Sequence, residues 1–388
     1  MKAAPTEMSV RPDPSPTLPP MTACSPSSGL PRREFIRLTA MAAASSLACS
    51  LRAASPGAGG NVPLGMDAYS LRAYKWPASR LIAYAAEQRL DAVLFNGLKA
   101  FERLDDAYLT GLRQAAASAG IRLYVGIGSV TPGSTTFLKD YGSVDDLLTL
   151  GVRVATALGS SVVNCRIGNL ADRSTPGGIE ARMAELIHAL RSVRTRAQDA
   201  GLKFAVENHA ADLRTEEMLQ VIQAAGADTT GVMLDPGNAL WAMEDPMRQL
   251  EQLGRYVACT SIRDYMVWPT PEGAMFQWTA VGEGLMDVPA YVATMARLCP
   301  DVPLLLETIS NSPRPIPYLQ PDYWKVYPAV RAADIVEFLA LCRRGHAIPT
   351  VQAPAGADPE AFEQEYQRGE LERSLAYLRA HGPAGRKS

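Results

Sequence analysis

With 388 residues, 47% of them hydrophobic, the chain is long enough to bury a large core in one big domain or in two. A formal net charge of −2 argues against nucleic acid or an acidic membrane surface as a partner, because both require a clustered positive field. We therefore expect a small-molecule ligand that is neutral or weakly charged.

Residues 1–60 have the composition of a disordered leader followed by an export signal. The first 31 residues hold eight of the 29 prolines and show no apolar periodicity. The paired arginines of "RREFIRL" precede a short apolar run and the small-residue stretch "AASPGAGG", and this order resembles a twin-arginine signal. The resemblance implies a periplasmic or secreted protein with no membrane span after signal removal. An amphipathic N-terminal helix is the alternative.

From residue 61 onward, short apolar runs alternate with helical patterns, and the chain predicts an α/β fold. Apolar runs such as "VPLLLE" are typical of a parallel sheet that helices cover on both faces. Eight such units within 61–350 predict a (β/α)8 TIM barrel. An open doubly wound sheet is the competitor, but no strand runs into a G-x-G-x-x-G turn. The predicted strands are 62–69, 91–96, 121–128, 161–167, 203–209, 230–236, 256–263 and 303–309. The predicted helices are 78–89, 105–119, 144–158, 179–200, 215–225, 245–253, 289–298 and 329–344.

Two further segments stand out. The stretch from Tyr265 to Val288 is much longer than the usual connection of about 2–6 residues in such units, so we expect it to cover the pocket. Residues 351–388 predict a linker and an extra C-terminal helix, with Asp358 as its cap and Pro359 at its first position. A partner-binding arm is the alternative for this tail.

The strand ends are the places to search for chemistry, because a barrel builds its active site from the loops that follow its strands. The fifth strand ends "FAVENH", the sixth "GVMLDPGN" and the eighth "PLLLETIS". Alternation along the fifth strand puts Ala205 and Glu207 on the luminal face and Phe204 and Val206 under the helices. The same alternation in the sixth and eighth strands brings Asp235 and Glu307 to the same mouth.

Three buried carboxylates at one mouth carry a large desolvation cost unless a cation or protons compensate their charge. Oxygen-rich ligation suits Mg²⁺ or Mn²⁺, and one added imidazole extends the choice to Co²⁺ or Zn²⁺. The alternative is that each carboxylate pairs with a lysine or arginine, such as Arg166 at the end of the fourth strand or Arg263 on the seventh.

The motifs "VENHA", "LDPGNALWAMEDP", "SIRD", "VGEGLMDV" and "LLLETIS", in this order, resemble the sugar phosphate isomerase/epimerase family of the xylose isomerase-like barrels. The segment "PYLQPDYWKVYP" resembles an exported subgroup. The resemblance implies a divalent metal held by Glu207, Asp235 and Glu307, with Ser261 at the position of the family histidine. Because a neutral serine is a poor ligand, we expect Mn²⁺, Mg²⁺ or Co²⁺ and disfavour Zn²⁺. His209, water or substrate would supply a further donor.

The resemblance also implies an enzyme, a metal-dependent isomerase or epimerase that works through an enediolate, with Glu207 and Glu307 as base and acid. For an exported protein we expect a non-phosphorylated sugar or keto-sugar as the substrate. A keto-glycoside lyase or dehydratase on the same site is one alternative, and a non-catalytic carbohydrate-binding barrel is another. A homo-oligomer is left open. The expected substrate contacts are His209, Asn238, Arg166, Tyr69, Arg263, Trp278 and Trp268.

Overall fold

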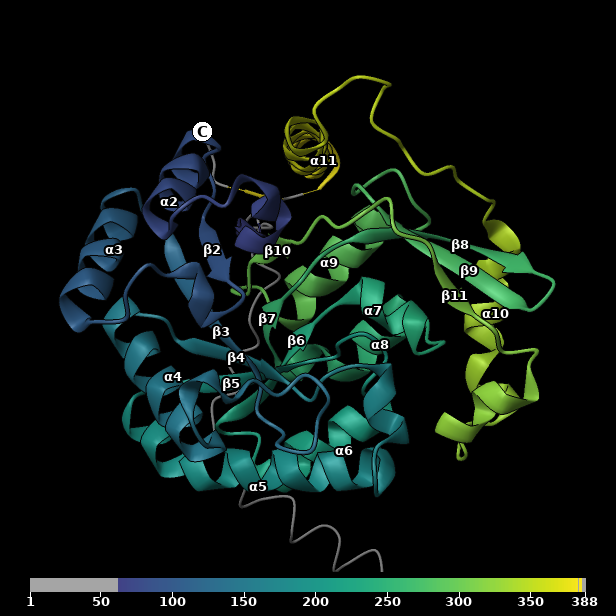
Figure 1. The fold of residues 1–388 in the computed structure, drawn as a ribbon, viewed down its shortest axis with the longest axis horizontal. Helices are drawn as coiled ribbons and strands as arrows, with labels where there is room; N and C mark the ends of the chain where they lie inside the picture. Colours follow the sequence, from purple (N-terminus) through teal and green to yellow (C-terminus); the bar gives the residue numbers. More distant parts are fainter. Residues whose placement is uncertain (1–61, 383, 386–388) are drawn as a thin grey trace, which may run out of the picture. The chain divides into compact units, whose positions relative to one another are not determined.

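The computed structural model describes residues 62–382, 384 and 385, and the expected leader and export signal lie outside the described residues. Eight parallel strands form one sheet in the order β10, β1, β2, β3, β4, β5, β6, β7. The sheet curls on itself, because Ile262 forms a parallel bridge with Leu306 and the Glu307 amide donates to the Ile262 carbonyl at 3.0 Å. The TIM-barrel prediction is confirmed (Figure 1). The strands are β1 (Leu64–Asp67), β2 (Ala92–Phe95), β3 (Arg122–Ser129), β4 (Val162–Arg166), β5 (Lys203–Glu207), β6 (Thr230–Leu234), β7 (Val257–Thr260) and β10 (Leu304–Leu306).

A helix follows each of the first seven barrel strands close to its expected position. Local sequence starts several of them: Asp245 accepts a hydrogen bond from the Arg248 amide at 2.9 Å, and Pro246 takes the first helical position. In the same way, Ser143 and Asp146 form a capping box. The helices are α2 (Ala78–Glu87), α3 (Asp106–Ser118), α4 (Val144–Leu158), α5 (Gly178–Asp199), α6 (Thr215–Ala225), α8 (Pro246–Leu253) and α9 (Val288–Leu298). Among the described residues, no helix is both long and apolar enough to cross a membrane.

The alternation expected for the fifth strand is present. Phe204 and Val206 belong to the large core between the strands and the helices, whereas Ala205 belongs to the smaller core inside the barrel. Glu207 therefore points to the luminal side, as Ala205 does. This orientation sets up the site at the mouth.

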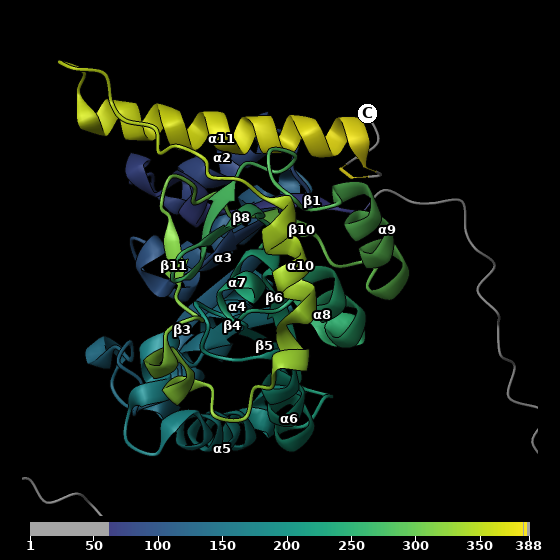
Figure 2. The ribbon, with the colours of Figure 1, turned by 90° about the vertical axis from the view of Figure 1, so that its right-hand side faces the viewer.

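The eighth barrel helix is not the one that the sequence predicts. The helix expected at 329–344 begins later, as α10 (Val336–Arg344), and its Phe338 and Leu341 pack in a separate core away from the barrel. The eighth position on the barrel belongs to α11 (Pro359–His381), the predicted C-terminal helix, whose Leu371, Leu375 and Leu378 join the barrel core. Figure 1 shows α11 end-on between α2 and α9, and Figure 2 shows its full length.

Glu370, on the barrel side of α11, is a buried carboxyl whose ionisation destabilises the fold. Its side chain is 1% exposed and its Oε1 has no hydrogen-bond partner in the described structure. Burial raises the pKa of Glu370 to about 7, although Ser310 and Arg373 favour its charged form and Glu283 opposes it. The unfolded carboxyl releases its proton near pH ~4.3. Between these values the folded chain binds more protons, so the free energy of unfolding falls as the pH rises, by at most about 1.4 kcal/mol per unit from this group.

We expect Glu370→Gln to remove this part of the pH dependence, because glutamine is a neutral isostere of the protonated carboxyl. Urea unfolding should show the variant to be more stable than the wild type at pH 8 and close to it at pH 4. The exposed Glu365 of the same helix, changed to glutamine, is the control and should leave the curve unchanged. Parallel curves for Glu370→Gln and the wild type would contradict the prediction.

The long segment after the seventh strand is a β-hairpin rather than an irregular loop. Strands β8 (Asp264–Thr270) and β9 (Gly273–Thr279) pair antiparallel, and β11 (Arg314–Ile316) adds to β9. We call these three strands the side sheet; α10 packs on it, and Tyr265, Val267 and Phe276 fill the core between them. The short apolar, aromatic-containing runs "DYMVWPT" and "GAMFQWT", which flank a turn with Pro271 and Gly273, are the sequence signal for this hairpin.

Candidate active site

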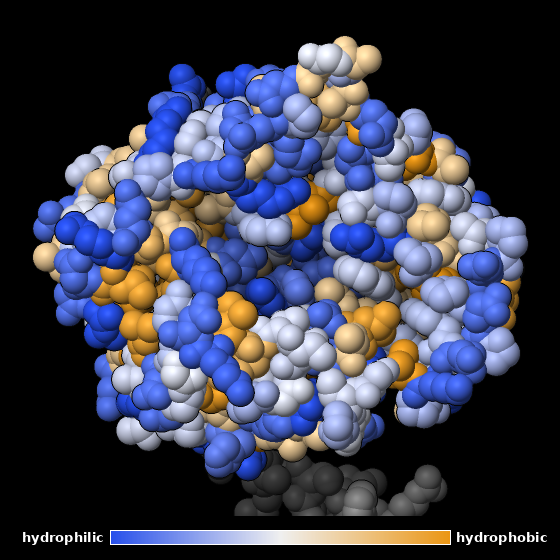
Figure 3. Space-filling view, in the orientation of Figure 1, coloured by the Kyte–Doolittle hydropathy of each residue, from blue (hydrophilic) through white to orange (hydrophobic). Residues whose placement is uncertain are grey.

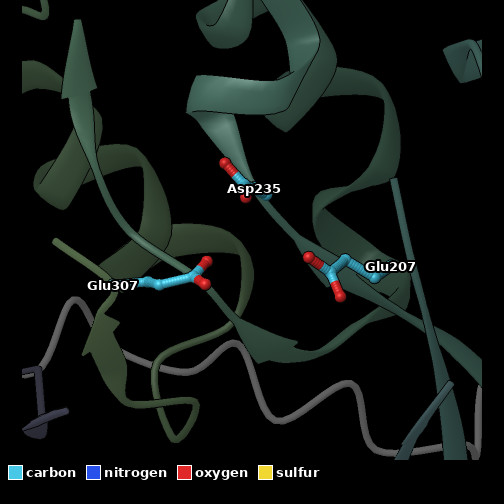
Figure 4. A group of neighbouring side chains, drawn as sticks. All are labelled: Glu207, Asp235 and Glu307. Carbon is cyan, nitrogen blue, oxygen red and sulfur yellow. The ribbon is translucent and has the colours of Figure 1, made fainter. Parts of the chain in front are cut away.

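The three predicted carboxylates converge at the mouth of the barrel. Glu207 is the last residue of β5, Glu307 follows β10, and Asp235 caps the short helix α7 (Pro236–Trp241) that follows β6. One carboxylate oxygen from each lies within 4.8 Å of the others, and all three side chains are buried. Figure 4 shows the three groups pointing toward one another from three sides.

Two arginines lie against this triad. Arg263 donates through Nη2 to both Asp235 Oδ2 and Glu307 Oε2. Arg166 is more distant, with Nη1 at 3.7 Å from Glu207 Oε2, and that oxygen has no hydrogen-bond partner in the described structure. The two alternatives weighed from the sequence, a convergent triad and arginine pairing, therefore coexist.

Burial is the main cause of the shifted pKa values of Glu207 and Asp235. It raises the pKa of Glu207 to about 8, with Glu307 and Asp235 adding to the rise and Arg166 opposing it. It raises the pKa of Asp235 to about 6, and here Arg263 is the main opposing charge. The guanidinium of Arg263 thus compensates Asp235 more fully than any arginine compensates Glu207.

Asp67 is a fourth buried carboxylate that the sequence prediction missed. It ends β1, accepts hydrogen bonds from Asn96 Nδ2 at 3.0 Å and from the Tyr69 amide at 2.8 Å, and is fully buried. Burial and the charge of Glu307 raise the pKa of Asp67 well above its usual value. The strand parity that found Glu207 would have found Asp67 as well, because Gly65 and Asp67 share a face of β1.

Short polar side chains position the triad. Ser261, at the expected histidine position, is buried and donates through Oγ to Glu307 Oε2 at 2.6 Å. Asn238 donates through Nδ2 to Asp235 Oδ2 at 2.6 Å. Asn208 binds the backbone of Asp235 twice, donating to its carbonyl at 2.8 Å and accepting from its amide at 2.9 Å. Ser261 therefore orients Glu307 in this structure.

His209 lies beside the triad as a neutral imidazole. Burial lowers the pKa of His209 to about 3, and the charge of Arg166 lowers it further. Its Nδ1 is hydrogen-bonded to the Gly168 carbonyl. Because a carbonyl only accepts, this partner assigns the proton to Nδ1 and leaves a lone pair on Nε2.

A cavity of about 530 Å³ opens above the triad. Figure 3 shows a hollow near the middle of this face, chiefly hydrophilic where it is deepest. Six of the seven expected substrate contacts line the cavity, together with Glu307, and Arg263 lies over the Trp278 ring at 4.4 Å. The seventh, Trp268, does not line it: this residue pairs with Met275 toward the tip of the β8–β9 hairpin, whereas Trp278 pairs with Tyr265 near the other end. The six are Tyr69, Arg166, His209, Asn238, Arg263 and Trp278.

The side sheet and α7 add wall residues that the sequence did not single out. Arg314 of β11 lies with its guanidinium carbon 5.5 Å from the Trp241 ring centre and 5.9 Å from that of Trp278. No carboxylate pairs with Arg314 in the part of the chain that the structure describes, and its Nε is buried without a partner. No local motif marks Arg314, because its position depends on the pairing of β11 with β9.

Residues 82–325 match the family described as xylose isomerase-like TIM barrel, and the chain belongs to this family. The match includes all three members of the triad.

Two curated relatives are distant. An uncharacterised protein of Escherichia coli K12, YihM, is 22% identical over 62% of this chain and 71% of its own length. The 3-oxo-isoapionate decarboxylase of Pectobacterium atrosepticum is 27% identical over 50% of this chain. The aligned part covers 64% of that enzyme's length.

Solved structures share the fold. The D-psicose 3-epimerase of Clostridium cellulolyticum H10, solved with D-tagatose, gives a TM-score of 0.51 at 14% identity, over 81% of this chain and 99% of that one. The zinc-bound IolI protein gives 0.51 at 15% identity, over 74% and 100% of the two chains. At these identities the likeness concerns the fold alone.

Proposed function

We propose that this protein is a divalent-metal-dependent sugar isomerase or epimerase that acts on a non-phosphorylated sugar or keto-sugar through an enediolate. The observation that carries the proposal is the approach of Glu207 and Glu307 from different sides of one barrel mouth, with Asp235 between them. Sugar epimerases of known structure share this fold, which supports the reaction class.

The donor set fits a divalent cation. Three carboxylates within reach of one another are the ligands that hard cations take, and the unpartnered Oε2 of Glu207 is a buried acceptor that lacks a donor. Glu207, Asp235 and Glu307 would hold the ion, once the Arg263 guanidinium leaves the two oxygens that it now binds. A bound dication would supply Lewis-acid stabilisation of an enediolate.

The two glutamates are suited to proton transfer on one substrate carbon. Glu307 accepts hydrogen bonds from Ser261 and Arg263, whereas Glu207 keeps one oxygen free for a substrate proton. Removal of a proton by one glutamate and its return by the other on the opposite face inverts a stereocentre. Return to the adjacent carbon gives isomerisation, and loss of a group from the next carbon gives elimination.

The test combines metal analysis with isotope exchange. The purified protein is analysed for Mn, Mg, Co and Zn by mass spectrometry and then incubated in D₂O with ketoses and keto-glycosides. We expect deuterium incorporation at a carbon next to the carbonyl, lost with EDTA and restored by Mn²⁺. A metal-free protein that binds sugars without exchange would contradict the proposal and favour a carbohydrate-binding barrel.

A second candidate function, favoured by Arg314, is cleavage of an acidic keto-sugar. An unpaired guanidinium between two tryptophans is suited to a substrate carboxylate. A β-keto acid held there would break its C–C bond, release CO₂ and leave the electron pair on an enediolate, which a proton then quenches. The decarboxylase among the relatives supports this alternative.

Arg314→Gln separates the two candidates. If the substrate is acidic, the variant should bind a carboxylated sugar such as D-glucuronate about tenfold or more weakly, the usual scale for a lost charge-assisted hydrogen bond. Binding of neutral D-glucose should change far less. Calorimetric titration measures both, and equal small effects on the two sugars would exclude the acidic substrate.

We also propose that the protein is exported through its N-terminal signal. A fusion of residues 1–60 to a reporter tests this proposal. Changing both Arg32 and Arg33 to lysine should retain the reporter in the cytoplasm.

A further inference from the structure

A second cavity, of about 420 Å³, lies beside the central pocket and shares two of its wall residues, Tyr69 and Asn96. Its other walls come from the segment that follows β1, from α2 and from the turn after β2. Ligand pockets usually measure about 300–1,000 Å³, so this cavity has room for one further ring-sized group. The lining residues of this cavity include Leu71, Lys75, Trp76, Leu81, Gly97 and Lys99.

Hydrogen bonds to Asp67 fix the two residues, Tyr69 and Asn96, that separate the two cavities. Asp67 accepts hydrogen bonds from the Tyr69 amide and from the side chain of Asn96, which also accepts from Arg166 at 3.4 Å. Tyr69 is nevertheless 46% exposed, with the Arg72 guanidinium over one part of its ring at 4.9 Å. A ligand that spans both cavities would cover this ring, and the fixed amide of Asn96 would face its middle.

The walls of the second cavity fit an uncharged ring. Leu71 and Leu81 supply apolar surface, and Trp76 is fixed by the Tyr74 ring at 4.3 Å and the Arg80 guanidinium at 4.6 Å. Such a rigid aromatic wall loses little entropy when a flat ring packs on it.

The charged groups at the rim of the second cavity already have partners. Lys75 pairs with Glu360 at 2.7 Å, Lys99 with Asp140 at 2.8 Å, and Arg72 lies 3.7 Å from Glu363. Since each of these cations faces a carboxylate, the rim offers no net positive charge to an anionic group. This distinguishes the second cavity from the central pocket, where Arg314 has no such partner.

We propose that the second cavity binds the second unit of a two-unit substrate, so that the protein acts on glycosides rather than on free monosaccharides. The sugar unit lies at Glu207 and Glu307, the glycosidic linkage crosses at Tyr69 and Asn96, and an uncharged ring, a second sugar or an aryl group, lies against Trp76. This inference rests on the proposed function for the position of the sugar unit only.

Gly97 offers a way to fill the second cavity without straining the fold. Its φ of 178° is extended backbone that any residue adopts, and a Cβ built there meets no atom within 4 Å. Gly97→Leu therefore places an apolar side chain in the second cavity without a clash at its Cβ. Gly111 is the matched control, because it is exposed on α3, its Cβ also meets nothing within 4 Å, and it lines neither cavity.

The experiment titrates the full chain calorimetrically with matched methyl and phenyl β-glycosides of glucose, galactose and xylose. We expect the phenyl compound of at least one pair to bind about tenfold tighter, the scale of burying part of an apolar ring. Gly97→Leu should bring the ratio close to one, and Gly111→Leu should keep it at the wild-type value. Equal binding within every pair, no binding by any pair, or a ratio that Gly97→Leu leaves unchanged would overturn the proposal.

Isotope exchange tests the isomerase proposal independently of the proposal for the second subsite. Metal-dependent exchange into a one-ring keto-sugar, combined with no phenyl preference, would retain the isomerase proposal and remove the second subsite. A phenyl preference that Gly97→Leu abolishes, in a protein that shows no exchange with any keto-sugar, would support the subsite and remove the isomerase.

Discussion

Changing Glu207 to glutamine is expected to lower the rate of deuterium exchange into a substrate by about 10²–10⁴, the usual contribution of a positioned acid or base. Glutamine keeps the shape of the side chain but cannot take up a proton. The variant should fold, because burial already raises the pKa of Glu207 to about 8 and glutamine resembles the protonated form. Exchange followed by NMR gives the rate, and thermal unfolding of the same sample verifies the fold.

The control for this variant is Glu180→Gln, an exposed glutamate in the first turn of α5. It should leave the exchange rate unchanged. If Glu207→Gln retained the wild-type rate while Glu307→Gln lost it, Glu207 would not transfer the proton, and a mechanism with a single glutamate would replace the two-base scheme.

Removing Arg263 is expected to have the second large effect, on stability and on metal binding together. In the wild type, one guanidinium binds Asp235 and Glu307, and it lies on the same oxygens that a metal would take. With EDTA present, Arg263→Met should lower the free energy of unfolding by about 3–5 kcal/mol, because it leaves buried carboxylates without their cation. Mn²⁺ should restore more stability to the variant than to the wild type, since no guanidinium then competes for the site.

Urea unfolding with EDTA and with Mn²⁺ measures the stability effect, and calorimetry measures the affinity for Mn²⁺ directly. Trp278 gives an optical readout, because its ring lies under the Arg263 guanidinium at 4.4 Å and its fluorescence should change when that group moves. Arg248→Met, at an exposed pair with Glu251, is the control and should change neither quantity by much. Weaker Mn²⁺ binding by Arg263→Met would show that Arg263 assists the ion rather than competing with it.

Eight apolar strand runs alternating with helical patterns were sufficient to predict the barrel. The period-2 alternation within the strands, with the rule that parallel strands end at the same edge, brought Glu207, Asp235 and Glu307 to one mouth. The same rule places Asp67, at the end of the first strand, at this mouth as well.

Other features depend on contacts between distant parts of the chain. Arg263 could be named as a counter-ion from its position at the end of the predicted seventh strand, but its bridging of Asp235 and Glu307 depends on how the ends of three strands meet. If the segment from Tyr265 to Val288 is a loop, nothing in the sequence distinguishes the expected roles of Trp278 and Trp268. Their separation appears only once β8 and β9 are paired, because this pairing places one near the mouth and the other near the tip.

The assignment of the eighth helix was wrong for a related reason. Residues 329–344 follow the last barrel strand, and helical spacing alone could not show that Phe338 and Leu341 pack on the side sheet. The helix that takes the eighth position has a mixed inner face, where Gln367, Glu370 and Ser374 lie among the leucines. Gln367 and Ser374 bind backbone groups at 2.9 and 3.0 Å, contacts that no periodic pattern reveals.

The position of α11 has a consequence for how the protein is made. Leu371, Leu375 and Leu378 cover apolar side chains beside the first strand, which is synthesised some three hundred residues earlier. During translation that surface stays uncovered until nearly all of the polypeptide has been made, and exposed apolar surface of this kind favours aggregation of the incomplete chain. A premature stop codon between Glu307 and α11 would therefore release a chain that contains Glu207, Asp235 and Glu307 but lacks the helix that covers this apolar surface.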